Sequence, residues 1–140
     1  MKRVTGIGGI FFKSNDPAKT REWYNRHLGI PTDQYGGHWK FRDLEDPEKV
    51  CIGSWSPFSK STEYFQPSEK QFMINYRVDN LVELLKVLEE EGVQIVGKMH
   101  EESYGKFAWI MDLDGNKIEL WEPVDKVLLD WHDNQSESLS

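Results

Sequence analysis

The sequence predicts an α+β domain in which strands and helices follow one another in a repeated order. Short segments with alternating apolar and polar residues indicate strands. Two longer segments carry capping residues at their ends and indicate helices. The order strand, helix, strands occurs twice along the chain. With 140 residues the chain has the length of one ordinary domain.

In the first half, a strand at residues 5–14 comes before a helix at residues 15–29. Asp16 suits the N-cap position, Pro17 the first helical position, and Gly29 a left-handed C-terminal turn. These residues predict both ends of the helix. Two further strands are expected at residues 36–44 and 48–57.

The second half begins with a strand at residues 71–78, where apolar and polar side chains alternate. The helix at residues 79–92 has the clearest pattern, because Asn80 and Glu83 are spaced as a capping pair and Gly92 ends it. Three strands are expected after it, at residues 93–99, 106–112 and 116–122.

The two halves resemble each other by residue number, which indicates an internal duplication. Gly9–Asn15 matches Met73–Asp79 at an offset of 64, and Ile52–Pro57 matches Ile118–Pro123 at an offset of 66. Insertions in the loops account for the small difference between the two offsets. We therefore expect one domain at residues 1–124, with modules at about 4–57 and 70–124 and a C-terminal tail at 125–140.

Charge and cysteine content exclude several classes of function. The net charge of −7, without a basic patch, argues against nucleic acid or an anionic membrane as a partner. Glycines interrupt the N-terminal apolar run, so we expect neither a signal peptide nor a membrane span, and a cytoplasmic location. The single cysteine, Cys51, excludes an internal disulfide and a multi-cysteine zinc site.

Two segments carry a resemblance to a known family: NDPAKTREWYNRHLG after the first strand and DLDGNKIELWEP near the end. In their order and spacing, about residues 4–124 resemble the vicinal oxygen chelate superfamily of glyoxalase I, extradiol dioxygenases and bleomycin-resistance proteins. The resemblance implies two βαβββ modules whose eight strands form a curved mixed sheet around a cup, with the helices outside. It also implies a small-molecule site in that cup.

The resemblance implies a metal held by four positions, of which this chain keeps one. Those positions fall on Gly9, Gly53, Met73 and Glu119. Glycine has no side chain to coordinate with, and a thioether is a poor ligand for hard divalent ions. We therefore expect no cofactor and no tightly held metal, so the site is degenerate. Replacement ligands such as His38 or His100, from neighbouring strands, are the alternative.

Period-two alternation points Glu119 into the cup, because its neighbours Ile118 and Leu120 must face the opposite side. One interpretation is an internal ion pair with Arg77 or Lys117 that only sets the sheet register. The other, which the sequence favours, is a small-molecule site that uses Glu119. The predicted ligand-binding residues around it are Asn75, Arg77, Lys117, Trp55, Trp121, His38 and Tyr104.

Three functions remain open, and the sequence favours the first. The first is a metal-independent protein that binds a small organic molecule, as the bleomycin-resistance branch implies. The second is an enzyme with Glu119 as general base and with Asn75 and Arg77 as oxyanion donors. The third is a metal-dependent lyase, isomerase or dioxygenase. The family and an apolar cluster in the tail, Val127, Leu128, Leu129 and Trp131, also predict a homodimer.

Overall fold

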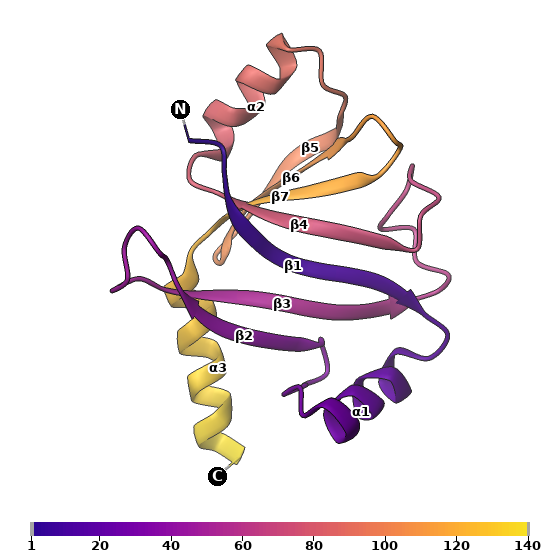
Figure 1. Ribbon diagram of the computed structural model, residues 1–140, viewed down its shortest axis with the longest axis vertical. Helices are drawn as coiled ribbons and strands as arrows, with labels where there is room; N and C mark the ends of the chain where they lie inside the picture. The colour runs from indigo at the N-terminus through magenta and orange to yellow at the C-terminus, as the bar shows by residue number, and fades with distance from the viewer. Residues whose placement is uncertain (1, 140) are drawn as a thin grey trace.

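The computed structural model describes residues 2–139, and these form a mixed β-sheet with three helices (Figure 1). The α+β class and the seven strands expected from the sequence pattern are confirmed. The elements are β1 (Val4–Ser14), α1 (Pro17–Leu28), β2 (Gly37–Arg42), β3 (Val50–Ser59), β4 (Phe72–Val78), α2 (Leu81–Glu90), β5 (Ile95–Glu102), β6 (Gly105–Met111), β7 (Lys117–Pro123) and α3 (Asp125–Leu139).

The strand order is β2-β3-β1-β4-β7-β6-β5, with β1 and β4 antiparallel at the centre. β3 lies parallel to β1 on one side, and β7 lies parallel to β4 on the other. The sheet is open, and the eighth strand expected from the family resemblance is absent between residues 2 and 139. Residues 29–36 contribute only an isolated bridge, Thr32 to Gly37, because Pro31 lacks an N–H and Gly36 has a φ of 142°.

One row of paired residues crosses the sheet and organises its concave face. In register, His38 of β2 pairs with Ser54, Ser54 with Gly9, Gly9 with Asn75, Asn75 with Glu119, and Glu119 with Trp109 of β6. Paired residues in neighbouring strands point to the same face. These six residues, the central row, therefore line one face of the sheet from β2 to β6.

Helix α1 covers the opposite face of the first half. Asp16 caps the helix by accepting from the Lys19 amide at 3.2 Å, and Gly29 ends it with a φ of 69°, as the sequence predicts. Trp55 follows Ser54 in β3, so it points away from the central row and packs against Phe12 and Tyr24. The ring centroid of Trp55 lies 5.2 Å from that of Phe12 and 4.7 Å from that of Tyr24.

Helix α2 covers the same opposite face in the second half. Asn80 caps it by accepting from the Glu83 amide at 3.1 Å. Its apolar side packs against β6 and β7 because Leu120, next to Glu119 in sequence, faces away from the central row. The buried core consists of Val78, Leu81, Leu84, Ala108 and Leu120.

The segment expected as a C-terminal tail forms helix α3, which lies on the concave face alongside β2 and β3 (Figure 1). Trp131 packs on Tyr35 with centroids 5.9 Å apart, and Asp133 pairs with Lys40 at 2.8 Å. Part of the apolar cluster that predicts a homodimer thus covers its own sheet, and the homodimer stays a prediction. None of the helices in residues 2–139 is long and apolar enough to cross a membrane.

Candidate small-molecule site

A cavity of about 570 Å³ opens above the Glu119 end of the central row. Its walls are largely aromatic, and Leu128 of α3 adds an apolar side chain. The polar groups are few and include Ser54, Asn75 and Glu119. Such a mixture is typical of small-molecule sites, in which apolar walls bury the ligand and a few polar atoms orient it. The aromatic residues are Phe11, Tyr64, Tyr104, Phe107, Trp109 and Trp121.

Glu119 is the polar centre of this cavity and is only 3% exposed. Oε1 accepts from the Asn75 amide at 2.7 Å, and Oε2 accepts from the Trp109 indole at 2.9 Å. The Tyr64 hydroxyl also donates to Oε2. A carboxylate accepts about four hydrogen bonds, so three protein donors satisfy most of its capacity. One acceptor position on Oε1 is left for a bound molecule.

Asn75 supplies a second acceptor to the cavity floor. Because its amide nitrogen donates to Glu119, its Oδ1 must point the other way, toward Gly8. This oxygen is buried and has no hydrogen-bond partner in the part of the chain that the structure describes. A Cβ on Gly8 would collide with it and with Trp121, so only glycine fits there. Both residues line the cavity.

Burial shifts the pKa values of two groups beside Glu119. The pKa of Tyr64 is raised, chiefly by burial and then by the negative charge and hydrogen bond of Glu119. Tyr64 therefore remains a donor. The pKa of Lys117 is lowered by burial, which Glu119 partly opposes. Its Nζ donates to the Tyr64 carbonyl at 2.7 Å and lies 5.3 Å from the Tyr64 ring centroid.

The ion pair between Arg77 and Glu119, one of the two interpretations of Glu119, does not form, because Arg77 pairs with Asp125 at the start of α3. Both partners are buried, and Arg77 also donates to the Ile52 carbonyl at 2.9 Å. Asp125 accepts from the Ile52 amide at 3.0 Å. The guanidinium lies over Trp121, 5.3 Å from the ring centroid. Arg77 therefore anchors α3 to the sheet.

The predicted site residues fall into four groups. Asn75, Glu119, Trp121 and Tyr104 gather around the cavity. Arg77 and Lys117 are buried, and their charged ends are engaged by Asp125 and by the Tyr64 carbonyl. Trp55 packs under α1 on the opposite face, since residues next to inward-facing Ser54 must point outward. His38 lies at the other end of the central row.

Sequence reasoning missed two of the three groups that hold Glu119. Tyr64 comes from the loop between β3 and β4, where no period fixes a direction for its side chain. Trp109 lies in β6, and its pairing with Glu119 in register places both on one face. The alternation of β6 could have indicated Trp109. No sequence signal points to Tyr64, apart from the aromatic character of its loop.

A second cavity of about 480 Å³ adjoins the first and shares Ser54, Ser56, Tyr104 and Leu128 with it. Asp33, His38 and His132 line it. Burial lowers the pKa of both His38 and His132. The other histidine expected near the site, His100, lines the first cavity and lies 2.6 Å from Glu102 through Nε2.

Comparison with known families agrees with this architecture. The profile of the Glyoxalase/Bleomycin resistance protein/Dioxygenase superfamily matches residues 6–120. The chain belongs to this superfamily. The resemblance noted in the sequence is thereby confirmed. No curated protein sequence matches the chain.

Solved structures of this superfamily share the fold at low sequence identity. Methylmalonyl-CoA epimerase from Mycobacterium tuberculosis is 20% identical with a TM-score of 0.59, over 92% of this chain and 95% of that one. A variant of the Streptomyces coelicolor epimerase in complex with 2-nitronate-propionyl-CoA is 13% identical with a TM-score of 0.65, over 86% and 99%. The Mn(II)-bound glyoxalase from Novosphingobium aromaticivorans is 13% identical with a TM-score of 0.59, over 87% and 40%.

The residues of this chain do not fit the four-ligand metal that the family implies. Gly9 has no side chain, Met73 offers only a thioether, and in β3 it is Ser54, not Gly53, that lies in the central row beside Gly9. Around Glu119, the fourth position, the protein supplies hydrogen-bond donors from Tyr64, Asn75 and Trp109 where a metal would need lone pairs. The carboxylate is thus satisfied by donors, and the Glu119 end of the row is built as an acceptor site.

Proposed function

We propose that this chain binds a small organic molecule carrying at least one hydroxyl or amine donor, in the cavity above Glu119. One observation carries the proposal: a buried carboxylate and a buried amide oxygen lie together on the floor of an aromatic cavity. A buried acceptor without a donor costs about 1–3 kcal/mol, so a bound donor group stabilises the site. The aromatic walls favour a flat, apolar body on the ligand.

The charge of the site selects among ligands of that size. Glu119 is negative, the unpartnered Oδ1 of Asn75 beside it is an acceptor, and the chain carries a net charge of −7. An anionic ligand would bring like charge into a buried site, which is costly. We therefore expect a neutral or cationic ligand to bind more tightly than an anionic ligand of similar shape.

The hydrogen bonds of Glu119, Arg77 and Asn75 favour binding over turnover as the role of this site. Glu119 accepts from three protein donors, which hold it as a fixed acceptor rather than a free base. Arg77, one of the two oxyanion donors of the catalytic hypothesis, is engaged by Asp125 and the Ile52 carbonyl. The other donor, Asn75, directs its N–H to Glu119. The enzymatic hypothesis thus lacks a free pair of donors for a developing negative charge.

A titration with three aromatic probes tests the proposal. Phenol and toluene have the same shape, and benzoate adds a negative charge. We expect phenol to bind about tenfold more tightly than toluene, since a hydrogen bond to a charged acceptor contributes about 1.5 kcal/mol or more. Benzoate should bind more weakly than phenol. Binding is followed by the NMR shift of the Trp109 indole N–H, which donates to Glu119.

Substitutions assign the preference to Glu119. Glu119→Gln should remove most of the preference for phenol over toluene, because the remaining acceptor position loses its charge. The matched control is His27→Gln, on the exposed surface of α1, which should behave as the wild type. Equal affinity for phenol and toluene in the wild-type protein, or no shift of the indole signal with either, would contradict the proposal.

A further inference from the structure

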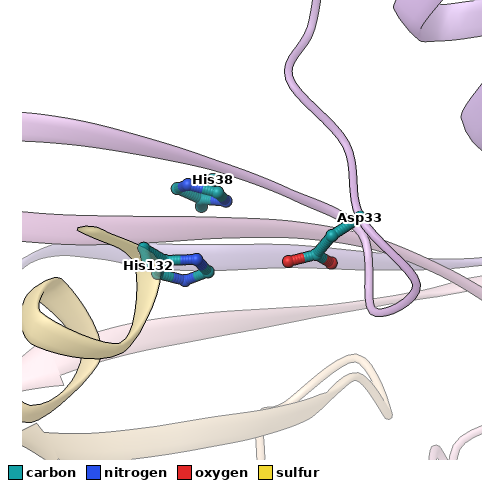
Figure 2. A group of neighbouring side chains, drawn as sticks. All are labelled: Asp33, His38 and His132. Carbon is teal, nitrogen blue, oxygen red and sulfur yellow. The ribbon is translucent and has the colours of Figure 1, made fainter. Parts of the chain in front are cut away.

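Three side chains that can bind metal converge at the His38 end of the central row, from three separate segments. Asp33 lies in the loop before β2, His38 in β2 and His132 in α3 (Figure 2). One ligand atom from each residue lies within 4.8 Å of the others. All three side chains are half-buried and line the second cavity.

The Asp33 carboxylate is oriented by its own loop. Its Oδ1 accepts from the backbone amides of Tyr35 at 2.8 Å and Gly36 at 3.2 Å. The Asp33 amide in turn donates to the Gly36 carbonyl at 2.8 Å, which closes the loop. One carboxylate oxygen is thereby held by backbone donors, so the direction of the other is fixed. Hydrogen bonds of this kind orient carboxylate ligands in metal sites.

The two imidazoles lie close enough together for one metal ion to bind both after their side chains rotate. Their rings are stacked, with centroids 3.6 Å apart and planes inclined by 19°. Two nitrogens bound tetrahedrally at about 2.1 Å from one ion are about 3.4 Å apart. An imidazole binds a metal in the plane of its ring, so both rings must turn out of the stack before their nitrogens face one ion. The ligand atoms of the three residues lie at most 4.8 Å apart. To reach the spacing of metal-bound atoms, each pair must come closer by about 1.4 Å at most, which side-chain rotation can supply.

We propose that Asp33, His38 and His132 bind a divalent transition-metal ion of the zinc and cobalt class. Two imidazole nitrogens and one carboxylate oxygen suit such ions, and sites with three protein ligands keep a position open. Because all three residues line the second cavity, the open position faces it. This site revises the expectation that the chain binds no metal, and it is independent of the function proposed above.

The site is separate from the metal position of the family. His38 and Glu119 are four strand positions apart in the central row, and each step is about 4.8 Å, so they lie up to roughly 19 Å apart. The helix α3, which brings His132, lies beyond residues 6–120 that match the family profile. One ion therefore cannot bind to both ends of the row, and substitutions can distinguish them.

Titration of the EDTA-treated, dialysed full chain with Co²⁺, followed by visible absorption, tests the site, with Zn²⁺ displacing the cobalt. We expect one Co²⁺ per chain. His132→Gln and Asp33→Asn should each weaken binding by about tenfold or more, since even outer-shell changes in metal sites cost 10–100-fold. Asp33→Asn keeps an oxygen for the loop amides, so it tests the ligand if His132→Gln disturbs α3. Circular dichroism and melting verify that each variant is folded.

Two control variants decide where any bound metal lies. His27→Gln removes an exposed histidine of α1 and should leave cobalt binding unchanged. Glu119→Gln should also leave it unchanged, although the same substitution is expected to impair phenol binding. Failure to bind Co²⁺ or Zn²⁺ at micromolar concentration would overturn the proposal. Metal binding that is lost in Glu119→Gln but kept in His132→Gln and Asp33→Asn would overturn it as well.

Discussion

The two ends of the central row are built for opposite kinds of partner. At the Glu119 end, donors from Tyr64, Asn75 and Trp109 surround a carboxylate, and the free positions on Glu119 and Asn75 are acceptors. At the His38 end, two imidazoles and a carboxylate converge beside a cavity. The comparison teaches that one sheet face can support two chemistries, because loops and a helix add different side chains at each end.

Helix α3 connects the two ends, and its first residue is the strongest test of the comparison. Asp125 forms a buried ion pair with Arg77 and accepts from the Ile52 amide. Asp125→Ala leaves a buried guanidinium without its partner, so we expect a loss of about 3–5 kcal/mol in the free energy of unfolding. Urea denaturation measures it.

The control for Asp125 comes from the middle of the same helix. Asp133 pairs with Lys40 at 2.8 Å, and both side chains are about half exposed. Asp133→Ala should cost less than about 1 kcal/mol, as exposed ion pairs do. Similar losses in the two variants would mean that Asp125 does not anchor α3 to the sheet.

The next largest effect is expected at Glu119 itself. Glu119→Gln places an amide N–H₂ against one of the three groups that donate to the carboxylate, so at least one hydrogen bond is lost. We expect the free energy of unfolding to fall by about 1–3 kcal/mol. From sequence alone, a pocket role predicts an unchanged or raised melting temperature, because functional acids in apolar cups often strain the fold. The three protein donors of Glu119 reverse that expectation.

Glu101→Gln provides the matched control, since it removes the same charge from an exposed position in β5. Its effect should stay within about 0.5 kcal/mol. If Glu119→Gln were as stable as Glu101→Gln, the three donors would contribute little to folding. The Glu119 end would then be a ligand site only, as the sequence argument holds.

How far the sequence could predict the molecule depends on the range of the interactions. Alternation within a strand predicts the inward direction of Glu119, and capping residues predict the starts of α1 and α2, because both are local. The pairing of Arg77 with Asp125 joins residues 48 positions apart. Neither residue has a local pattern that identifies its partner. The sequence therefore offers the acid on the neighbouring strand, Glu119, as one alternative partner of Arg77, and that pair does not form.

The placement of α3 is the second point beyond the reach of the sequence. The segment after Pro123 lies outside the duplication, so no matching element in the first half predicts its position. Only the folded chain brings His132 against His38 and Asp33. A single histidine with no histidine at metal-ligand spacing carries almost no signal in a sequence. The candidate metal site therefore depends on tertiary structure alone.

The smallest expected effect distinguishes a metal site from a docking contact at the His38 end. Without metal, His132→Gln removes one half-exposed stacking contact, while Asp125, Leu128 and Trp131 still hold α3. We expect the free energy of unfolding, measured by urea denaturation, to fall by under about 1 kcal/mol, as for other aromatic pairs.

Added zinc gives the second measurement. With Zn²⁺ at about 100 times its Kd, the free energy of unfolding of the wild-type protein should rise by about 2.7 kcal/mol and that of the variant by much less. A metal-free loss as large as that of Asp125→Ala, with no gain from Zn²⁺ in the wild type, would mean that the histidines serve to dock α3. The two ends would then differ only in which groups hold the fold together.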